Sequence, residues 1–149
     1  MSKPFLPPQT RPVGSSPVGR ITDLPPAEGW WIRAFRHWGG EERVLSEDMT
    51  GRFGAARAKR ILSRFDELME ILVSHARRPL MAHGAGCQCL GSDEAVFALF
   101  CTTATHGARE DAMMIACLMV RPDVAPIAVS LAQGLGLEIE RGLRARKLC

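Results

Sequence analysis

The stretch F-G-A-A-R-A-K-R-I-L-S-R-F-D-E-L-M-E-I-L-V-S-H-A, from Phe53 to Ala76, decides the fold class. Its large apolar residues recur at i, i+4, i+7 and i+11, which places them on one face of a helix: Ile61, Phe65, Leu68 and Leu72. A stripe of this period is typical of a long amphipathic helix that packs on a core. We expect the helix to end before Pro79, because proline disfavours helical conformation in the residue before it.

A second helix is predicted on the N-terminal side of this stretch. Asp23 can cap it, the prolines at 25 and 26 suit its first turn, and Gly39-Gly40 should end it. Its aromatic residues share one face: Trp31, Phe35 and Trp38. We interpret that face as core, with an aromatic cage for a ligand as the alternative.

Three more helices are predicted after the long one. Ser92 opens a helix through about Thr105, with acidic residues in its first turn. Residues 108–120 are apolar on nearly every side, which predicts a central helix. Residues 124–133 form a further helix that Gly134-Leu135-Gly136 should end, and the last residues fit a frayed helix or a short strand. The predicted fold class is therefore all-α, a small bundle of about five helices with short connections.

The N-terminal residues differ in composition from the rest of the chain. Residues 1–24 are rich in proline, glycine and serine and carry few apolar side chains. Such a segment cannot bury enough apolar surface to offset its ordering entropy, so we expect a flexible tail. Residues 25–149 are then expected to form a single helical domain.

The composition limits the classes of function. Of the 149 residues 46% are hydrophobic, and the net charge is only +3, so charge alone does not indicate nucleic acid. No apolar run reaches about 18 residues, so we expect no membrane-spanning helix. The first residues lack the apolar core of a secretion signal, which favours a cytoplasmic location. Five cysteines in a reducing compartment indicate metal binding or buried thiols rather than disulfides.

The strongest chemical motif is H-A-R-R-P-L-M-A-H-G-A-G-C-Q-C, from His75 to Cys89. Two imidazoles and two thiolates form a ligand set that tetrahedral Zn²⁺ prefers. Gly84 and Gly86 permit the sharp bend that would aim both sulfurs at one point. The predicted metal ligands are His75, His83, Cys87 and Cys89.

Alternatives remain open at this motif. Four ligands would make a closed, structural site that pins the loop, whereas His83, Cys87 and Cys89 alone would leave one position open for sensing or catalysis. Cys87 and His83 could instead form a thiolate–imidazole pair. The simplest alternative is that both cysteines are ordinary loop residues and that His75 caps a helix.

A basic stripe occupies the start of the long helix. No acidic residue lies between Asp48 and Asp66, a segment that contains five basic residues: Arg52, Arg57, Lys59, Arg60 and Arg64. The macrodipole disfavours cations at a helix start, so something should compensate. That compensation is either an acidic neighbour within the fold or an anionic partner such as RNA or DNA.

Three hypotheses about function follow. The first is a non-enzymatic, zinc-stabilised helical module that acts on a protein partner as a regulator or adaptor. The second is a metal or redox sensor that binds nucleic acid through Arg57, Arg60 and Arg64. The third is a small metalloenzyme with an open metal site. A homodimer would bury the apolar surface of residues 108–120, although a central position in a monomer explains that surface equally well.

Overall fold

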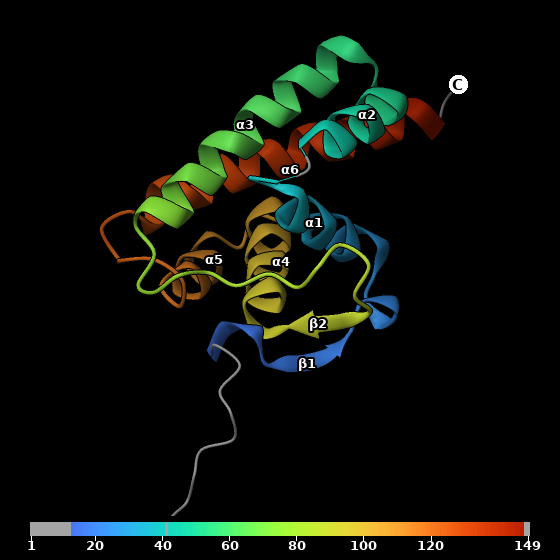
Figure 1. The fold of residues 1–149 in the computed structure, drawn as a ribbon. Coiled ribbons are helices and arrows are strands. Elements are labelled where there is room, and N and C mark those ends of the chain that lie inside the picture. Colours follow the sequence, from blue (N-terminus) through green and yellow to red (C-terminus); the bar gives the residue numbers. More distant parts are fainter. Residues whose placement is uncertain (1–12, 41, 148–149) are drawn as a thin grey trace, which may run out of the picture.

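The computed structural model describes residues 13–40 and 42–147 (Figure 1). Within these residues the chain forms six α-helices, two short 3₁₀ turns and one two-stranded sheet, which confirms the all-α prediction. The elements in chain order are η1 (Val13–Ser15), β1 (Pro17–Arg20), η2 (Ile21–Asp23), α1 (Pro26–His37), α2 (Glu42–Phe53), α3 (Ala55–Ser74), β2 (Cys89–Gly91), α4 (Ser92–Thr105), α5 (Arg109–Ala116) and α6 (Ala125–Lys147).

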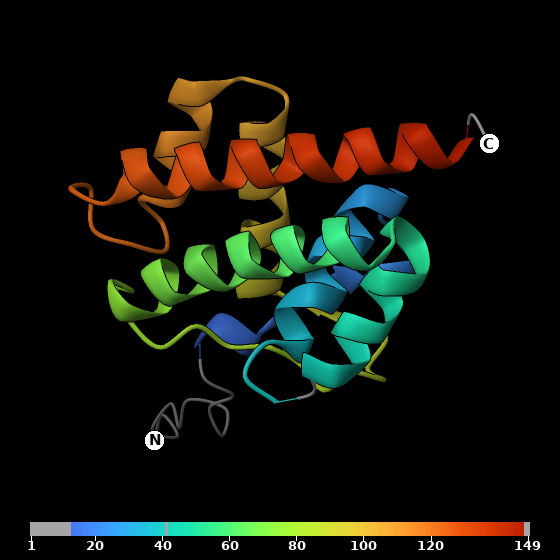
Figure 2. The same cartoon turned by 90° about the horizontal axis from the view of Figure 1, so that it is seen from above.

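The two longest helices, α3 and α6, lie side by side and run in opposite directions (Figure 2). The shorter helices α1, α4 and α5 lie beneath them in the view of Figure 1, and the β1–β2 pair forms the base. None of the helices in the described part of the chain is long and apolar enough to cross a membrane.

The core is centred on α4, and Phe97 is its aromatic hub. The Phe97 ring centroid lies 4.8 Å from that of Phe35, 6.1 Å from that of Trp31 and 6.4 Å from that of Phe65. Edge-to-face and tilted ring pairs at these spacings stabilise a core by more than the burial of their apolar surface alone would. The prediction that the aromatic face of this helix packs in the core is confirmed for Trp31 and Phe35, whereas Trp38 follows the last residue of α1 and is half-buried. The stripe of α3 is confirmed as well, since its four apolar residues are all buried.

The helix predicted at 108–120 is shorter and more peripheral than expected. It ends at Ala116, and only Ala112 and Ala116 of α5 are buried. Met114 is 71% exposed and Leu118, just beyond the helix, is 66% exposed. The prediction of a central helix was wrong because the apolar side chains on the outer face of this segment meet solvent rather than another helix.

The predicted helix end at Gly134-Leu135-Gly136 was also wrong, since α6 continues through both glycines to Lys147. Gly136 marks a close approach of α6 to α4. A Cβ atom at this position would lie 1.8 Å from Thr105 Oγ1. The glycine therefore serves helix packing rather than helix termination.

Two further differences concern the connections. Helix α2 was not predicted, because its sequence is mostly polar and only Leu45 and Met49 form a buried i, i+4 pair. Gly54, with a positive φ of 81°, makes the turn between α2 and α3. Asp23 lies in η2 and does not cap α1, whose first turn begins at Pro26.

Of the N-terminal segment 1–24, residues 1–12 lie outside the described residues. Residues 13–24 form η1, β1 and η2, and β1 pairs antiparallel with β2. Arg20 is opposite Cys89 and Gly19 is opposite Leu90 in this pairing. We call residues 13–24 the N-terminal arm; it lies directly against the loop that carries the His/Cys motif.

Candidate metal centre

The structure brings His83 and Cys87 together in the loop between α3 and α4. His83 Nδ1 lies 3.5 Å from Cys87 Sγ. Tetrahedral zinc holds an imidazole nitrogen and a thiolate sulfur roughly 3.6 Å apart, given Zn–N and Zn–S bonds of about 2.1 and 2.3 Å. Cys89 begins β2 two residues further on and is exposed. The spacing of the imidazole and the first thiol is therefore that of two ligands of one zinc ion.

The other side of the His83 ring fixes its orientation and its tautomer. Nε2 lies 2.8 Å from the backbone carbonyl oxygen of Ser15, in the N-terminal arm. A carbonyl can only accept, so Nε2 carries a proton. Nδ1 therefore faces Cys87, where it donates to the thiolate when the ring is protonated and is free to bind a metal when the ring is neutral. A metal-ligating histidine usually has this arrangement, with its second nitrogen donating to a carbonyl or carboxylate. Gly91 leaves room for the ring, because a Cβ there would lie 2.8 Å from His83 Cδ2.

The surroundings of Cys87 favour its thiolate. The backbone N–H of Cys89 lowers the pKa of the Cys87 thiol below its ordinary value, and the hydrogen bond with His83 lowers that pKa further. A thiolate is both the nucleophilic and the metal-binding form of cysteine. In contrast, burial raises the pKa of the Cys101 thiol in the core well above its ordinary value, so Cys101 is chemically inert.

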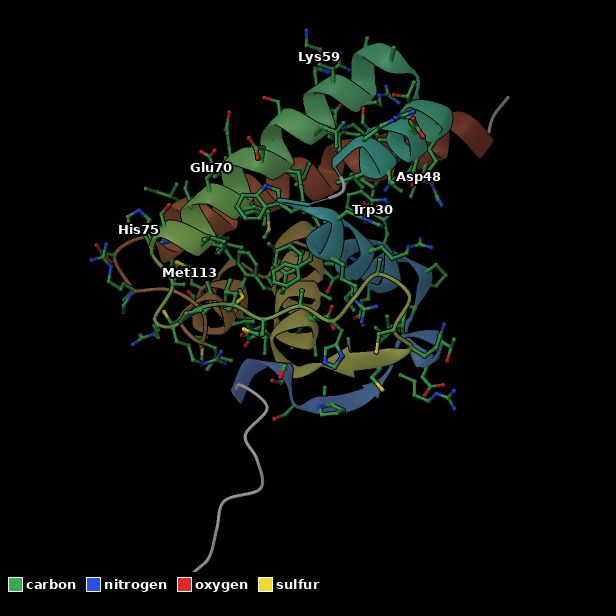
Figure 3. All side chains as sticks on the ribbon, viewed as in Figure 1. Trp30, Asp48, Lys59, Glu70, His75 and Met113 are labelled. Atoms are coloured by element: carbon green, nitrogen blue, oxygen red, sulfur yellow. The ribbon has the colours of Figure 1, made fainter. Side chains whose placement is uncertain are left out.

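The structure places the fourth predicted ligand, His75, elsewhere. His75 follows the last residue of α3, at the opposite end of the loop from Cys89 (Figure 3). Its Nδ1 lies 2.9 Å from Arg121 Nη2, and a guanidinium can only donate. Within the described ranges, no three histidine, cysteine or acidic side chains lie close enough together to bind one metal ion without some rearrangement.

A buried ion pair holds the backbone of this loop. The side chains of Arg36 in α1 and Glu94 in α4 are 1% and 0% exposed, and they meet at 2.5 Å (Nε to Oε2) and 3.0 Å (Nη2 to Oε1). The same guanidinium donates to the carbonyl oxygens of Gly84, Cys87 and Cys89, at 3.2, 2.7 and 2.8 Å. Arg36 therefore fixes the backbone at Cys87 and Cys89 and just after His83.

A second pair holds the earlier half of the loop. Arg78 binds Asp93 through two hydrogen bonds of 2.8 and 2.9 Å, and Asp93 also accepts from the backbone N–H of Met81 at 2.9 Å. A Cβ at Gly14 would lie 1.8 Å from Asp93 Oδ2, so the arm backbone packs directly on this pair. The acidic start of α4 is visible in the sequence, but nothing in the local pattern indicates that these carboxylates or Arg36 hold this loop.

The basic stripe has an acidic neighbour within the fold. Glu138 of α6 lies 3.6 Å from Arg57 Nε and 3.3 Å from Arg60 Nη2. Arg52 pairs with Asp48 at 3.0 Å along α2. One carboxylate between two guanidiniums explains how α3 accommodates cations in its first turns. Lys59, labelled at the upper end of α3 in Figure 3, and Arg64 are exposed. Nucleic-acid binding by the stripe stays a prediction.

Comparison with known proteins gives no match: no family model, no curated protein and no solved structure is significantly similar to this chain.

Proposed function

We propose that this chain is a non-enzymatic regulatory module that binds Zn²⁺ through His83, Cys87 and Cys89 and acts on a protein partner. The observation that supports the metal site is the His83–Cys87 geometry. One ring nitrogen lies at ligand spacing from a thiol with a lowered pKa, and the other nitrogen is bonded to the Ser15 carbonyl. His83 and Cys87 are already close together, and Cys89 lies two residues beyond Cys87. Three protein ligands leave one coordination position of a tetrahedral zinc ion for water or for a ligand from a partner.

The way the loop is held favours a regulatory over a structural metal. Arg36 and Arg78 already fix the loop backbone to α1 and α4 through hydrogen bonds within the protein. Metal binding then changes the chemistry of an ordered loop and is not needed to fold it. Classical structural zinc sites differ, since there the metal binding energy is folding energy.

The adjacent acidic side chains argue against a hydrolytic metalloenzyme. Such an enzyme needs a carboxylate or imidazole free to act as general base beside the metal-bound water. Asp93 and Glu94 are the buried carboxylates next to this loop, and each is engaged by an arginine. Because His83 is itself a ligand in this proposal, it cannot serve as the base.

A zinc competition titration with a chromophoric chelator tests the proposal. Metal-free protein should bind one Zn²⁺ per chain, and His83→Gln, Cys87→Ser and Cys89→Ser should each weaken binding by at least about tenfold. Cys117→Ser is the matched control, because it makes the same thiol-to-hydroxyl change at the end of α5 and should leave affinity unchanged. Equal affinity for the Cys87 and Cys117 variants would contradict the proposal.

His75→Gln distinguishes the three-ligand site from the four-ligand site predicted from sequence. With His75 bonded to Arg121, its replacement should leave zinc affinity unchanged. A loss as large as that of His83→Gln would show that the loop rearranges to a closed, four-ligand site. In that case the regulatory proposal would fail and a structural metal would replace it.

A further inference from the structure

A cavity of about 290 Å³ opens between α1, α4 and the C-terminal half of α6. It is separate from the His/Cys loop, and its walls are mostly apolar: Trp30, Trp31, Phe53, Ile139 and Leu143. Small-molecule sites are typically apolar clefts of about this size or larger, with a few polar groups that orient the ligand. Trp30 and Trp31 of α1 therefore belong to the core and also line this cavity.

The polar groups that line this cavity are rich in hydrogen-bond acceptors. Thr102 and Thr105 donate their hydroxyl hydrogens to the carbonyl oxygens of Ala98 and Cys101, at 2.9 and 2.7 Å. What remains at each hydroxyl oxygen is therefore acceptor capacity. Glu140 also lines the cavity, and its partly exposed carboxylate pairs with Arg144 at 3.5 Å. His106, at the end of α4, lines the cavity as well and can accept through its unprotonated ring nitrogen. These groups complement a donor or a cation.

The aromatic walls have the same electrostatic preference. The Trp30 and Trp31 ring centroids are 5.0 Å apart, and the ring planes meet at 77°. The two indoles meet edge to face, and an indole face that is left open toward the cavity attracts a cation more strongly than the face of the other aromatic side chains. A carboxylate beside aromatic walls is the combination that recognises organic ammonium ions.

We infer that this cavity binds a small hydrophobic ammonium ion: an amine carried on an apolar ring or short alkyl chain. The apolar part would lie against Ile139, Leu143 and the indoles, and the ammonium group would lie near Glu140. A volume of about 290 Å³ accommodates one ring with a two-carbon arm. This inference is independent of the metal proposal, because the two sites share no residue.

Three probes that differ in charge test the inference with the full chain: 2-cyclohexylethylammonium, 2-cyclohexylethanol and cyclohexylacetate. None absorbs where tryptophan emits, so the intrinsic fluorescence reports binding. Trp38 lies outside this cavity, and Trp38→Phe leaves only Trp30 and Trp31 as reporters. The ammonium ion should give a saturable change and bind at least about fivefold more tightly than the alcohol and the carboxylate.

Two variants locate the probe. Ala27→Phe fills the cavity mouth from an exposed position of α1 and should abolish the saturable change, whereas Ala56→Phe at an exposed position of α3 should preserve it. Glu140→Gln should reduce the preference for the cation over the alcohol. Equal or tighter binding of the alcohol or the carboxylate, no saturable change with the ammonium ion, or an unaffected Ala27→Phe variant would each overturn the inference.

Discussion

Arg36 and Glu94, 58 residues apart in the chain, form a buried two-point ion pair that also supports the backbone of the candidate ligands. Their contact joins α1 to the first turn of α4. The three remaining hydrogen bonds of Arg36 go to loop carbonyls, including those of Cys87 and Cys89. The candidate metal loop is thus built on a charge pair in the protein interior.

Removing one partner of this pair should destabilise the fold strongly. Arg36→Met keeps the apolar stem but leaves the Glu94 carboxylate buried without its cation, which costs about 3–5 kcal/mol of unfolding free energy. Arg43→Met is the control, because its ion pair with Glu47 is solvent-exposed and contributes at most about 1 kcal/mol. Urea denaturation measures both. Equal losses in the two variants would show that Arg36 does not hold the loop.

Cys87 should react with a thiol reagent at lower pH than an ordinary cysteine does. Its lowered pKa gives more thiolate at neutral pH, so alkylation by iodoacetamide should remain fast at a pH where an ordinary cysteine has slowed. Cys101, whose pKa burial raises, should react only after unfolding. Peptide mass spectrometry across a pH series reads out both sites. His83→Ala should move the Cys87 profile to higher pH, and an unchanged profile would contradict the assigned His83 contact.

Two glycines of α6 should respond oppositely to the same substitution. Gly134→Ala meets only Arg64 Nη1 at 4.0 Å and should stabilise the protein by up to about 1 kcal/mol through helix propensity. Gly136→Ala would place its Cβ against Thr105 and should cost about 1–3 kcal/mol. Thermal or urea unfolding compares the pair. A stabilising Gly136→Ala would mean that α4 and α6 do not approach closely there.

Zinc binding should strengthen the attachment of the N-terminal arm. A metal ion on Nδ1 would polarise the imidazole and make Nε2–H a better donor to the Ser15 carbonyl. Tryptic cleavage after Arg20, in the exposed strand β1, should therefore slow when zinc is bound. Trypsin should cleave the His83→Gln variant at the same rate with and without zinc, which controls for any effect of zinc on the protease itself. A wild-type rate that zinc does not change would separate the arm from the metal site.

The sequence predicted what depends on local spacing. The stripe of α3 follows the helical period, and His83 and Cys87 are only four residues apart in one loop; both features have a direct structural counterpart. The Arg36–Glu94 pair joins residues 58 positions apart, and nothing in the local pattern of either residue indicates the other.

The errors in the prediction have the same origin. Gly136 resembles a helix stop until Thr105 of α4 is known to lie against it. The apolar run at 108–120 indicates burial, but burial depends on which neighbours are available, and the outer face of α5 has none among the described residues. The sequence offers His75 and His83 equally as metal ligands. Only the tertiary contact between His75 and Arg121 distinguishes the two histidines.

The most direct test of the metal proposal is the zinc content of the purified protein, measured by elemental analysis without a histidine tag or chelator. We expect about one zinc per chain in the wild type and none in the Cys87→Ser/Cys89→Ser double variant, with both proteins folded. A wild-type protein without zinc, or a double variant that keeps it, would contradict the metal proposal.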